Sequence, residues 1–151
     1  MKPDLVEAAL AEIVPSTSLH ACLSLHQELA KASQAGMPFA SVSLVGTVLE
    51  SVLLALLHTK MGISKLSNGK ETASAELGPL LMEAISRRVF PNTSVQAACQ
   101  LVHIFRNRLH PGNEMRQEHK LTMRVAITLR VLFELSLIEW SRAVRDNPSA
   151  E

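Results

Sequence analysis

The sequence predicts an all-α fold, a bundle of about five to six helices in one domain over residues 1–146, followed by a flexible tail at 147–151. Three observations predict it. Apolar residues recur at the three- and four-residue spacing of helices along most of the chain, and no segment shows the alternation typical of strands. Proline and glycine separate these periodic segments. A chain of 151 residues that is 47% apolar and 19% charged can bury one real core.

Prolines, glycines and capping residues set the expected helix boundaries in order. Pro3 suits a first turn and Pro15 ends the first helix, while Gly36 and Pro38 separate the second helix from the third. After a polar loop, the fourth and fifth helices follow, and Pro111 with its neighbouring glycine ends the fifth. The expected helices span about 3–14, 16–35, 38–60, 75–89, 94–109 and 115–145, with the polar loop at 62–74.

Two apolar stretches bear on where helices lie. Residues 39–57 carry one charge, Glu50, over a length near the minimum for a membrane span. An acid near the bilayer centre costs roughly 3 kcal/mol, so we expect a buried helix of a soluble bundle and no membrane contact. In the last expected helix, residues 131–138 are apolar nearly all round, which predicts a central position for that helix.

Composition excludes several classes of function. Aromatic residues make up only 3% of the chain and tyrosine is absent, so single-strand binding by stacked aromatics is not expected. Cys22 and Cys99 sit in apolar helical patterns and are expected to be small core residues. The first residues do not resemble a secretory leader, which makes a cytoplasmic setting the expectation. No His, Cys or acid set has ligand spacing, so neither a metal nor another cofactor is expected.

The charges are unevenly distributed. Residues 84–130 hold eight basic and two acidic residues and net +6, while the rest of the chain nets −5. This basic segment is either a surface that faces an anion or a solvated helix surface whose charges balance in three dimensions. Its candidate RNA contacts are Arg108, Arg116, Lys120 and Arg124.

A polar stripe runs along the fifth expected helix, apart from its apolar face. His103, Arg106, Asn107 and His110 share this stripe at helical spacing. An arginine can clamp a phosphate with two parallel hydrogen bonds, and a histidine can exchange a proton near neutral pH. The alternative is that these side chains only cap the helix end and pair with nearby carboxylates.

Glu50 is a lone acid in an apolar helix, which is costly unless it is paired. Its structural role would be an ion pair with Arg106 or Arg124, and its functional role would be to orient Arg106. Gly46, one turn earlier, is expected to let another helix approach closely.

The run 106–112 (Arg-Asn-Arg-Leu-His-Pro-Gly), followed by a basic stretch and a long apolar helix, resembles the signature of HEPN-superfamily domains. Residues 45–54 resemble the third-helix pattern of some bacterial members, and the resemblance covers about residues 38–140. It implies a HEPN-like bundle that pairs as a homodimer, with the motif lining a cleft between protomers. Many members are metal-independent endoribonucleases of toxin–antitoxin or other defence systems. Others bind RNA or nucleotides, or act only as helical partners of a nucleotidyltransferase-type antitoxin.

Carried onto this chain, the resemblance implies three catalytic roles. Arg106 would bind the scissile phosphate, and His110 would act as general acid or base on the ribose 2′-hydroxyl or the leaving oxygen. Asn107 would orient one of these groups, and the product would be a cyclic phosphate. Three residues separate Arg106 from His110, fewer than in the usual family motif. A non-catalytic helical module that dimerises or binds a partner protein is therefore the alternative.

Overall fold

The computed structural model describes residues 3–109 and 121–147, and within them the chain is helical with no named strand. This confirms the all-α bundle. The α-helices are α1 (Pro3–Ile13), α2 (Ser16–Gln34), α3 (Pro38–Leu54), α4 (Leu77–Ser86), α5 (Thr93–Asn107) and α7 (Met123–Asp146). A π-helix at Ala55–Lys60 extends α3, and a short 3-10 turn at Thr72–Ser74 precedes α4.

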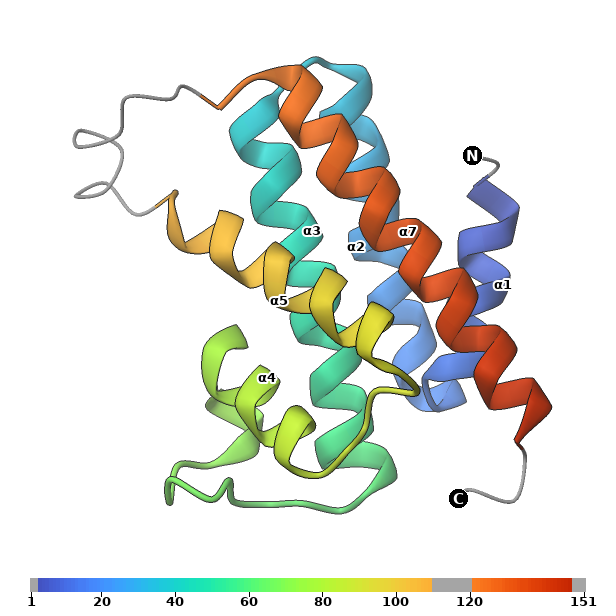
Figure 1. Cartoon of the computed structure of the whole chain (residues 1–151), viewed down its shortest axis with the longest axis vertical. Coiled ribbons are helices and arrows are strands. Elements are labelled where there is room, and N and C mark those ends of the chain that lie inside the picture. The colour runs from blue at the N-terminus through green and yellow to red at the C-terminus, as the bar shows by residue number, and fades with distance from the viewer. Residues whose placement is uncertain (1–2, 110–120, 148–151) are drawn as a thin grey trace.

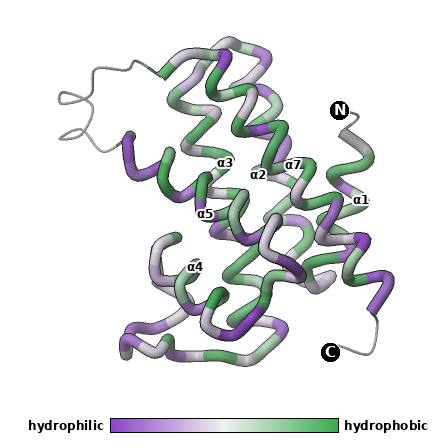
Figure 2. Tube along the Cα trace, viewed as in Figure 1, coloured by the Kyte–Doolittle hydropathy of each residue, from purple (hydrophilic) through white to green (hydrophobic). Residues whose placement is uncertain are grey.

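The helix α3 is the centre of the bundle and packs against α2, α4, α5 and α7 (Figure 1). Hydrophobic residues follow one another along it (Figure 2), and its buried positions include Val45, Leu49 and Leu53. Together with the π-helix it is long and apolar enough to cross a membrane by length and composition alone, but 61% of its most apolar window is buried within the protein. That burial is what a core helix of a bundle shows.

The expectation of a central α7 is wrong. One face of α7 is buried against α1, α3 and α5 and includes Phe133, Leu137 and Trp140. The opposite face leaves Val131 40% and Leu135 52% exposed. A segment that is apolar on all sides does not reveal which side meets the core, because helical periodicity carries no signal there.

Several helix ends differ from expectation for local reasons. The helix α7 begins at Met123, because the Thr122 side chain accepts a hydrogen bond from the Val125 amide at 3.3 Å; residues 115–120 of the expected helix lie outside the described residues. The helix α4 ends at Ser86, where Arg88 takes a positive φ of 55° and the chain turns. The loop before α4 is polar as expected, with a single antiparallel bridge between Lys65 and Glu71.

Glu83 ties this loop to α4. Its carboxylate accepts hydrogen bonds from the amide and the hydroxyl of Ser67, both at 3.0 Å, and from Nε of Arg87 at 2.8 Å. The amide of Ser67 and the guanidinium of Arg87 hold the pKa of Glu83 below its usual value although the residue is only 4% exposed. The loop is thereby tied to the C-terminal half of α4, the helix whose start forms one wall of the site.

Candidate functional site

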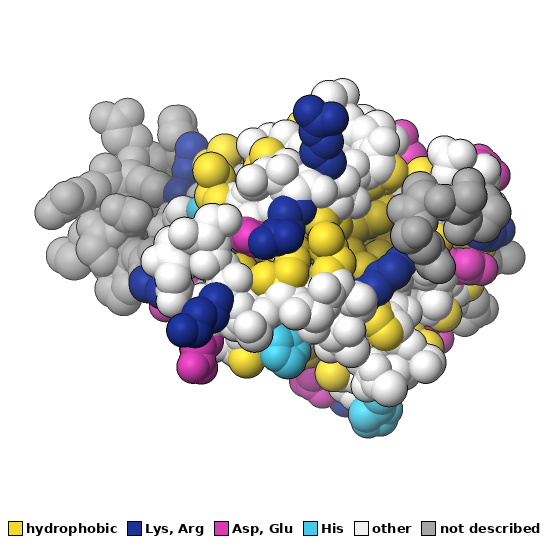
Figure 3. Space-filling model, turned by 90° about the horizontal axis from the view of Figure 1, so that it is seen from below, with side chains coloured by type: hydrophobic (Ala, Val, Ile, Leu, Met, Phe, Trp, Pro, Cys, Tyr) yellow, Lys and Arg dark blue, Asp and Glu magenta, His cyan; other side chains and the backbone are white. Residues whose placement is uncertain are grey.

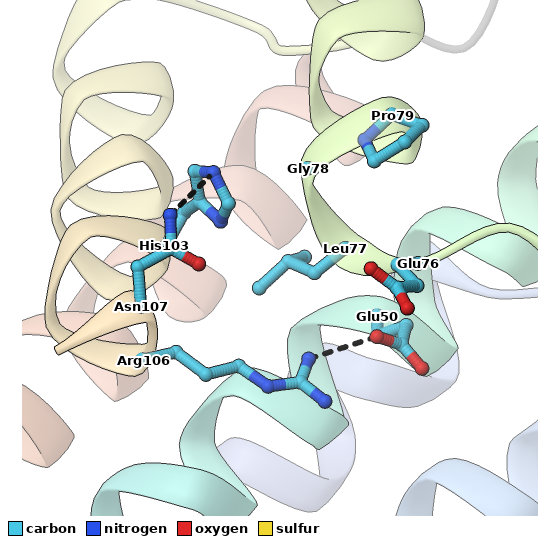
Figure 4. A pocket seen from close by; sticks show the side chains of 8 residues that line it. All are labelled: Glu50, Glu76, Leu77, Gly78, Pro79, His103, Arg106 and Asn107. Atoms are coloured by element: carbon cyan, nitrogen blue, oxygen red, sulfur yellow. Dashed lines mark hydrogen bonds and ion pairs between the residues drawn. The ribbon is translucent and has the colours of Figure 1, made fainter. Parts of the chain in front are cut away.

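A cavity of about 400 Å³ lies where the end of α5 meets the middle of α3 and the start of α4 (Figure 4). The fold brings these three segments together although they are far apart in sequence. The residues that line the cavity are Glu50, Glu76, Leu77, Gly78, Pro79, His103, Arg106 and Asn107.

Arg106 reaches from α5 across the cavity to Glu50 on α3. Its Nη1 donates a hydrogen bond to Oε2 of Glu50 at 2.8 Å, and each side chain is 29% exposed. Of the two partners considered for Glu50, the structure therefore selects Arg106. A guanidinium has five donors, so donors remain for a ligand after this bond is made. The ion pair fixes the direction of the guanidinium while part of it stays open to solvent.

Gly46 leaves the space that Arg106 occupies. A Cβ atom built on Gly46 would lie 2.4 Å from Cδ of Arg106, a distance that atoms do not tolerate. The expectation that Gly46 permits a close approach is borne out, and the group that approaches is this side chain rather than a helix backbone. Gly78, on α4, lies in the same way beside the ring of His103, with Cε1 3.2 Å from the Cβ position.

His103 and Asn107 form a pair on α5, one helical turn apart. Nδ2 of Asn107 lies 3.2 Å from Nε2 of His103 (Figure 4). If the amide donates, Nε2 accepts and the proton of a neutral imidazole is on Nδ1. Nδ1 is buried and has no hydrogen-bond partner among the described residues. A buried polar atom without a hydrogen-bond partner requires an explanation, and a bound ion or water molecule is one of them.

The cavity combines one cation with two acids. Glu50 is neutralised by Arg106, and Glu76 stands at the start of α4 with its carboxylate toward Glu50 in Figure 4. A phosphate must therefore approach Arg106 from the side away from these carboxylates, toward His103 and Asn107. Neutral donors on that side can share the charge of the phosphate with the guanidinium.

The structure brings together four of the predicted site residues, Glu50, His103, Arg106 and Asn107. The guanidinium of Arg108 instead lies over the ring of Phe105, 5.3 Å from its centroid, and this arginine is not part of the cavity. Arg124 is exposed in the first turn of α7 and is also outside it. Three further candidates lie outside the described residues: His110, Arg116 and Lys120.

Sequence reasoning missed the wall that α4 contributes. Glu76, Gly78 and Pro79 were expected inside a helix that began near Ala75, but α4 begins at Leu77 with Glu76 as its N-cap residue. The adjacent Gly78 and Pro79 are a signal for a helix start, because proline is favoured in the first turn. That signal could have placed the segment at a helix end.

No cluster of three or more His, Cys, Asp or Glu side chains that could hold a metal ion occurs within residues 3–109 and 121–147. The thiols are also unremarkable as ligands. Cys22 and Cys99 are buried and unbridged, and burial raises the pKa of Cys99 to about 12, so this thiol stays protonated.

Comparisons of the chain with protein-family models, with curated proteins and with solved structures found no match.

Proposed function

We propose that the Arg106 cavity, between α3, α4 and α5, binds a phosphodiester of RNA. On this proposal the protein is a HEPN-like, metal-independent endoribonuclease of a bacterial defence or toxin–antitoxin system. It acts in the cytoplasm as a homodimer. The observation that carries the proposal is the position of Arg106 in the cavity. Arg106 is held by Glu50 over Gly46, and it shares one cavity with the imidazole of His103 and the amide of Asn107.

The chemistry requires a cation for the phosphate and two groups that move protons. Attack of the ribose 2′-oxygen on phosphorus forms the cyclic phosphate as the bond to the 5′-oxygen breaks. One group takes the 2′-hydroxyl proton and another gives a proton to the departing oxygen. Arg106 would stabilise the charge that builds up on the phosphate. Two imidazoles are candidates for these roles: His103, which lines the cavity, and His110, which follows in the sequence and lies outside the described residues.

RNA cleavage in the presence of a chelator tests the proposal. We expect the wild-type protein to cut a labelled RNA and leave cyclic phosphate ends. Arg106→Ala and His110→Ala should each lower the rate by about 100-fold or more, the scale of losing one charge-stabilising or proton-transfer group. Arg142→Ala is the matched control, because Arg142 is an exposed arginine of α7 that lies outside the cavity and is not among the predicted RNA contacts. Intact RNA with the wild-type protein would reject cleavage, and equal cleavage by the Arg106 variant would reject this site.

The alternative is a non-catalytic helical module that dimerises or binds a partner protein, and the outer face of α7 favours it. Ile127, Val131 and Leu135 are spaced four residues apart and are 50%, 40% and 52% exposed. Such a stripe of apolar side chains is typical of a helix that packs on a partner. On this hypothesis the ion pair between Glu50 and Arg106 has only a structural role, and it neutralises the guanidinium that a phosphate would need.

Charge placed in this stripe tests the alternative. Leu135→Glu should dissociate a dimer that uses the stripe, because a carboxylate would be buried without a partner. Sedimentation velocity at micromolar concentration measures the change. Glu12→Lys, a charge change at an exposed position of α1 and not on the stripe, is the control and should leave the association state unaltered. A monomer already in the wild type, or a dimer that survives Leu135→Glu, would exclude the stripe as the dimer interface.

A further inference from the structure

A second and larger cavity, of about 910 Å³, lies away from the C-terminal end of α5, at the other end of the bundle. Four segments meet there: the end of α1, the π-helix, the α4–α5 connection and the end of α7. The apolar side chains of its wall include Ile13, Leu56, Phe90, Trp140 and Val144. A volume of this size is in the range of small-molecule sites, about 300–1,000 Å³.

Basic side chains surround this apolar wall. Lys60, Arg87 and Arg88 are all exposed, and the lining contains no acidic side chain among the described residues. Figure 3 views this end of the molecule and shows apolar surface recessed between Lys and Arg side chains. Arg87 forms an ion pair with Glu83, and Lys60 and Arg88 add two further positive charges at the rim.

Two rare backbone conformations meet at the same cavity. The π-helix Ala55–Lys60 contributes Leu56 and Lys60 to the lining; π-helical turns are uncommon and are often found at functional sites. Arg88 is the only non-glycine residue with positive φ within residues 3–109 and 121–147. Strained backbone of this kind is also concentrated at functional sites.

The conformation of Arg88 has a local structural origin. The amide of Val89 donates to the carbonyl of Ala84 at 2.9 Å, and the amide of Arg88 donates to that of Ile85 at 3.1 Å. These two bonds form the Schellman ending of α4, in which the residue at the position of Arg88 takes the left-handed conformation and is usually glycine. An arginine is less favourable there than glycine. A side-chain function at the rim of the cavity would explain why it is present.

We infer that this cavity is a binding site for a small amphipathic anion, a soluble carboxylate with an apolar chain, whose chain packs on Trp140 and Phe90 and whose head group meets Arg88 and Lys60. The inference does not depend on the proposed ribonuclease function, because none of these residues lines the first cavity, which contains Arg106.

Trp140 is the only tryptophan of the chain and reports on the site directly. It is 3% exposed, and its ring centroid lies 5.3 Å from that of Phe90. Decanoate, titrated below its micelle concentration, should change the fluorescence of Trp140 saturably. Decyltrimethylammonium has the same chain with a positive head and should bind at least fivefold more weakly. Loss of saturation with decanoate, or equal binding of the cation, would overturn the inference.

Variants of Arg88 separate a binding role from a structural one. Arg88→Gln should weaken decanoate binding about fivefold, while Arg142→Gln, an exposed charge on α7 outside the lining, should leave it unchanged. Arg88→Gly should weaken binding by the same factor and also raise the Tm of the unliganded protein by about 3 °C, because glycine relieves the left-handed strain. Arg106→Gln should not affect decanoate binding. Wild-type affinity in Arg88→Gln, or partition of the protein onto phosphatidylglycerol vesicles without decanoate binding, would overturn the assignment.

Discussion

Glu134→Ala should lower the free energy of unfolding by about 3 kcal/mol, because it removes the acid of a buried ion pair. Glu134 is 4% exposed on α7, where Nε of Arg130 donates to its Oε1 at 2.6 Å. Nε2 of His26, on α2, lies 3.5 Å from its Oε2. Removing the carboxylate leaves the partly buried guanidinium of Arg130 without its acceptor and the buried imidazole of His26 without its nearest acid, and that loss is larger than the worth of the contacts themselves.

Urea unfolding followed by circular dichroism measures this loss, and the Tm should fall by about 10 °C. Glu139→Ala is the matched control, since Glu139 is an exposed acid of the same helix, and it should change stability by about 0.5 kcal/mol or less. A Glu134 variant as stable as the Glu139 variant would show that the buried contacts contribute nothing.

The same carboxylate makes stability depend on pH in a direction that can be worked out. Burial raises the pKa of Glu134, but the contact with His26 and the charge of Arg130 together lower it by more than burial raises it. The pKa of Glu134 in the folded state therefore lies below the usual 4.5. The unfolded state therefore binds the proton more readily. The contribution to stability is complete above about pH 4.5 and is lost as the pH falls through the folded pKa. Glu134→Gln should flatten the pH dependence of the unfolding free energy in that acid range.

The sequence could not show this network, although it predicted the helices that hold it. Periodicity and helix breakers locate α2 and α7 because they are local signals. The burial of Glu134 depends on which face of α7 turns to the core. Residues 131–138 hide that face because apolar residues surround the single acid. The pairing with His26 joins residues more than a hundred positions apart, and no local pattern encodes it.

The candidate site was partly within reach of the sequence for the same reason. His103, Arg106 and Asn107 belong to one helix face, which helical geometry predicts. The contact of Arg106 with Glu50 was one of two pairings left open, because only tertiary packing decides between arginines. The α4 wall was missed because apolar periodicity placed the start of that helix near Ala75, two residues before Leu77. The pairing of Arg106 with His110 stays a prediction, since His110 lies outside the described residues.

On the proposed function, Gly46→Ala should lower the rate of RNA cleavage as much as Arg106→Ala does, by about 100-fold or more, although it removes no functional group. The added Cβ would lie 2.4 Å from Cδ and 3.2 Å from Cγ and Nε of Arg106. These atoms are in the middle of the side chain, so the guanidinium must leave Glu50 and the cavity. Ser43→Ala, an exposed change one turn earlier on α3, is the control and should retain the wild-type rate of RNA cleavage.

A double-mutant cycle tests this contact by stability alone, whatever the protein does to RNA. In the wild-type background the helix propensity gained by Gly46→Ala, about 1 kcal/mol, is outweighed by overpacking of about 1–3 kcal/mol. In the Arg106→Ala background the three atoms nearest to the added methyl are gone, so the same change should stabilise the protein by about 1 kcal/mol. The two backgrounds should differ by about 2 kcal/mol in urea unfolding. Additive effects would mean that the side chain of Arg106 does not lie over Gly46. The position of Arg106, the only Lys or Arg among the described residues that line the cavity, would then be wrong.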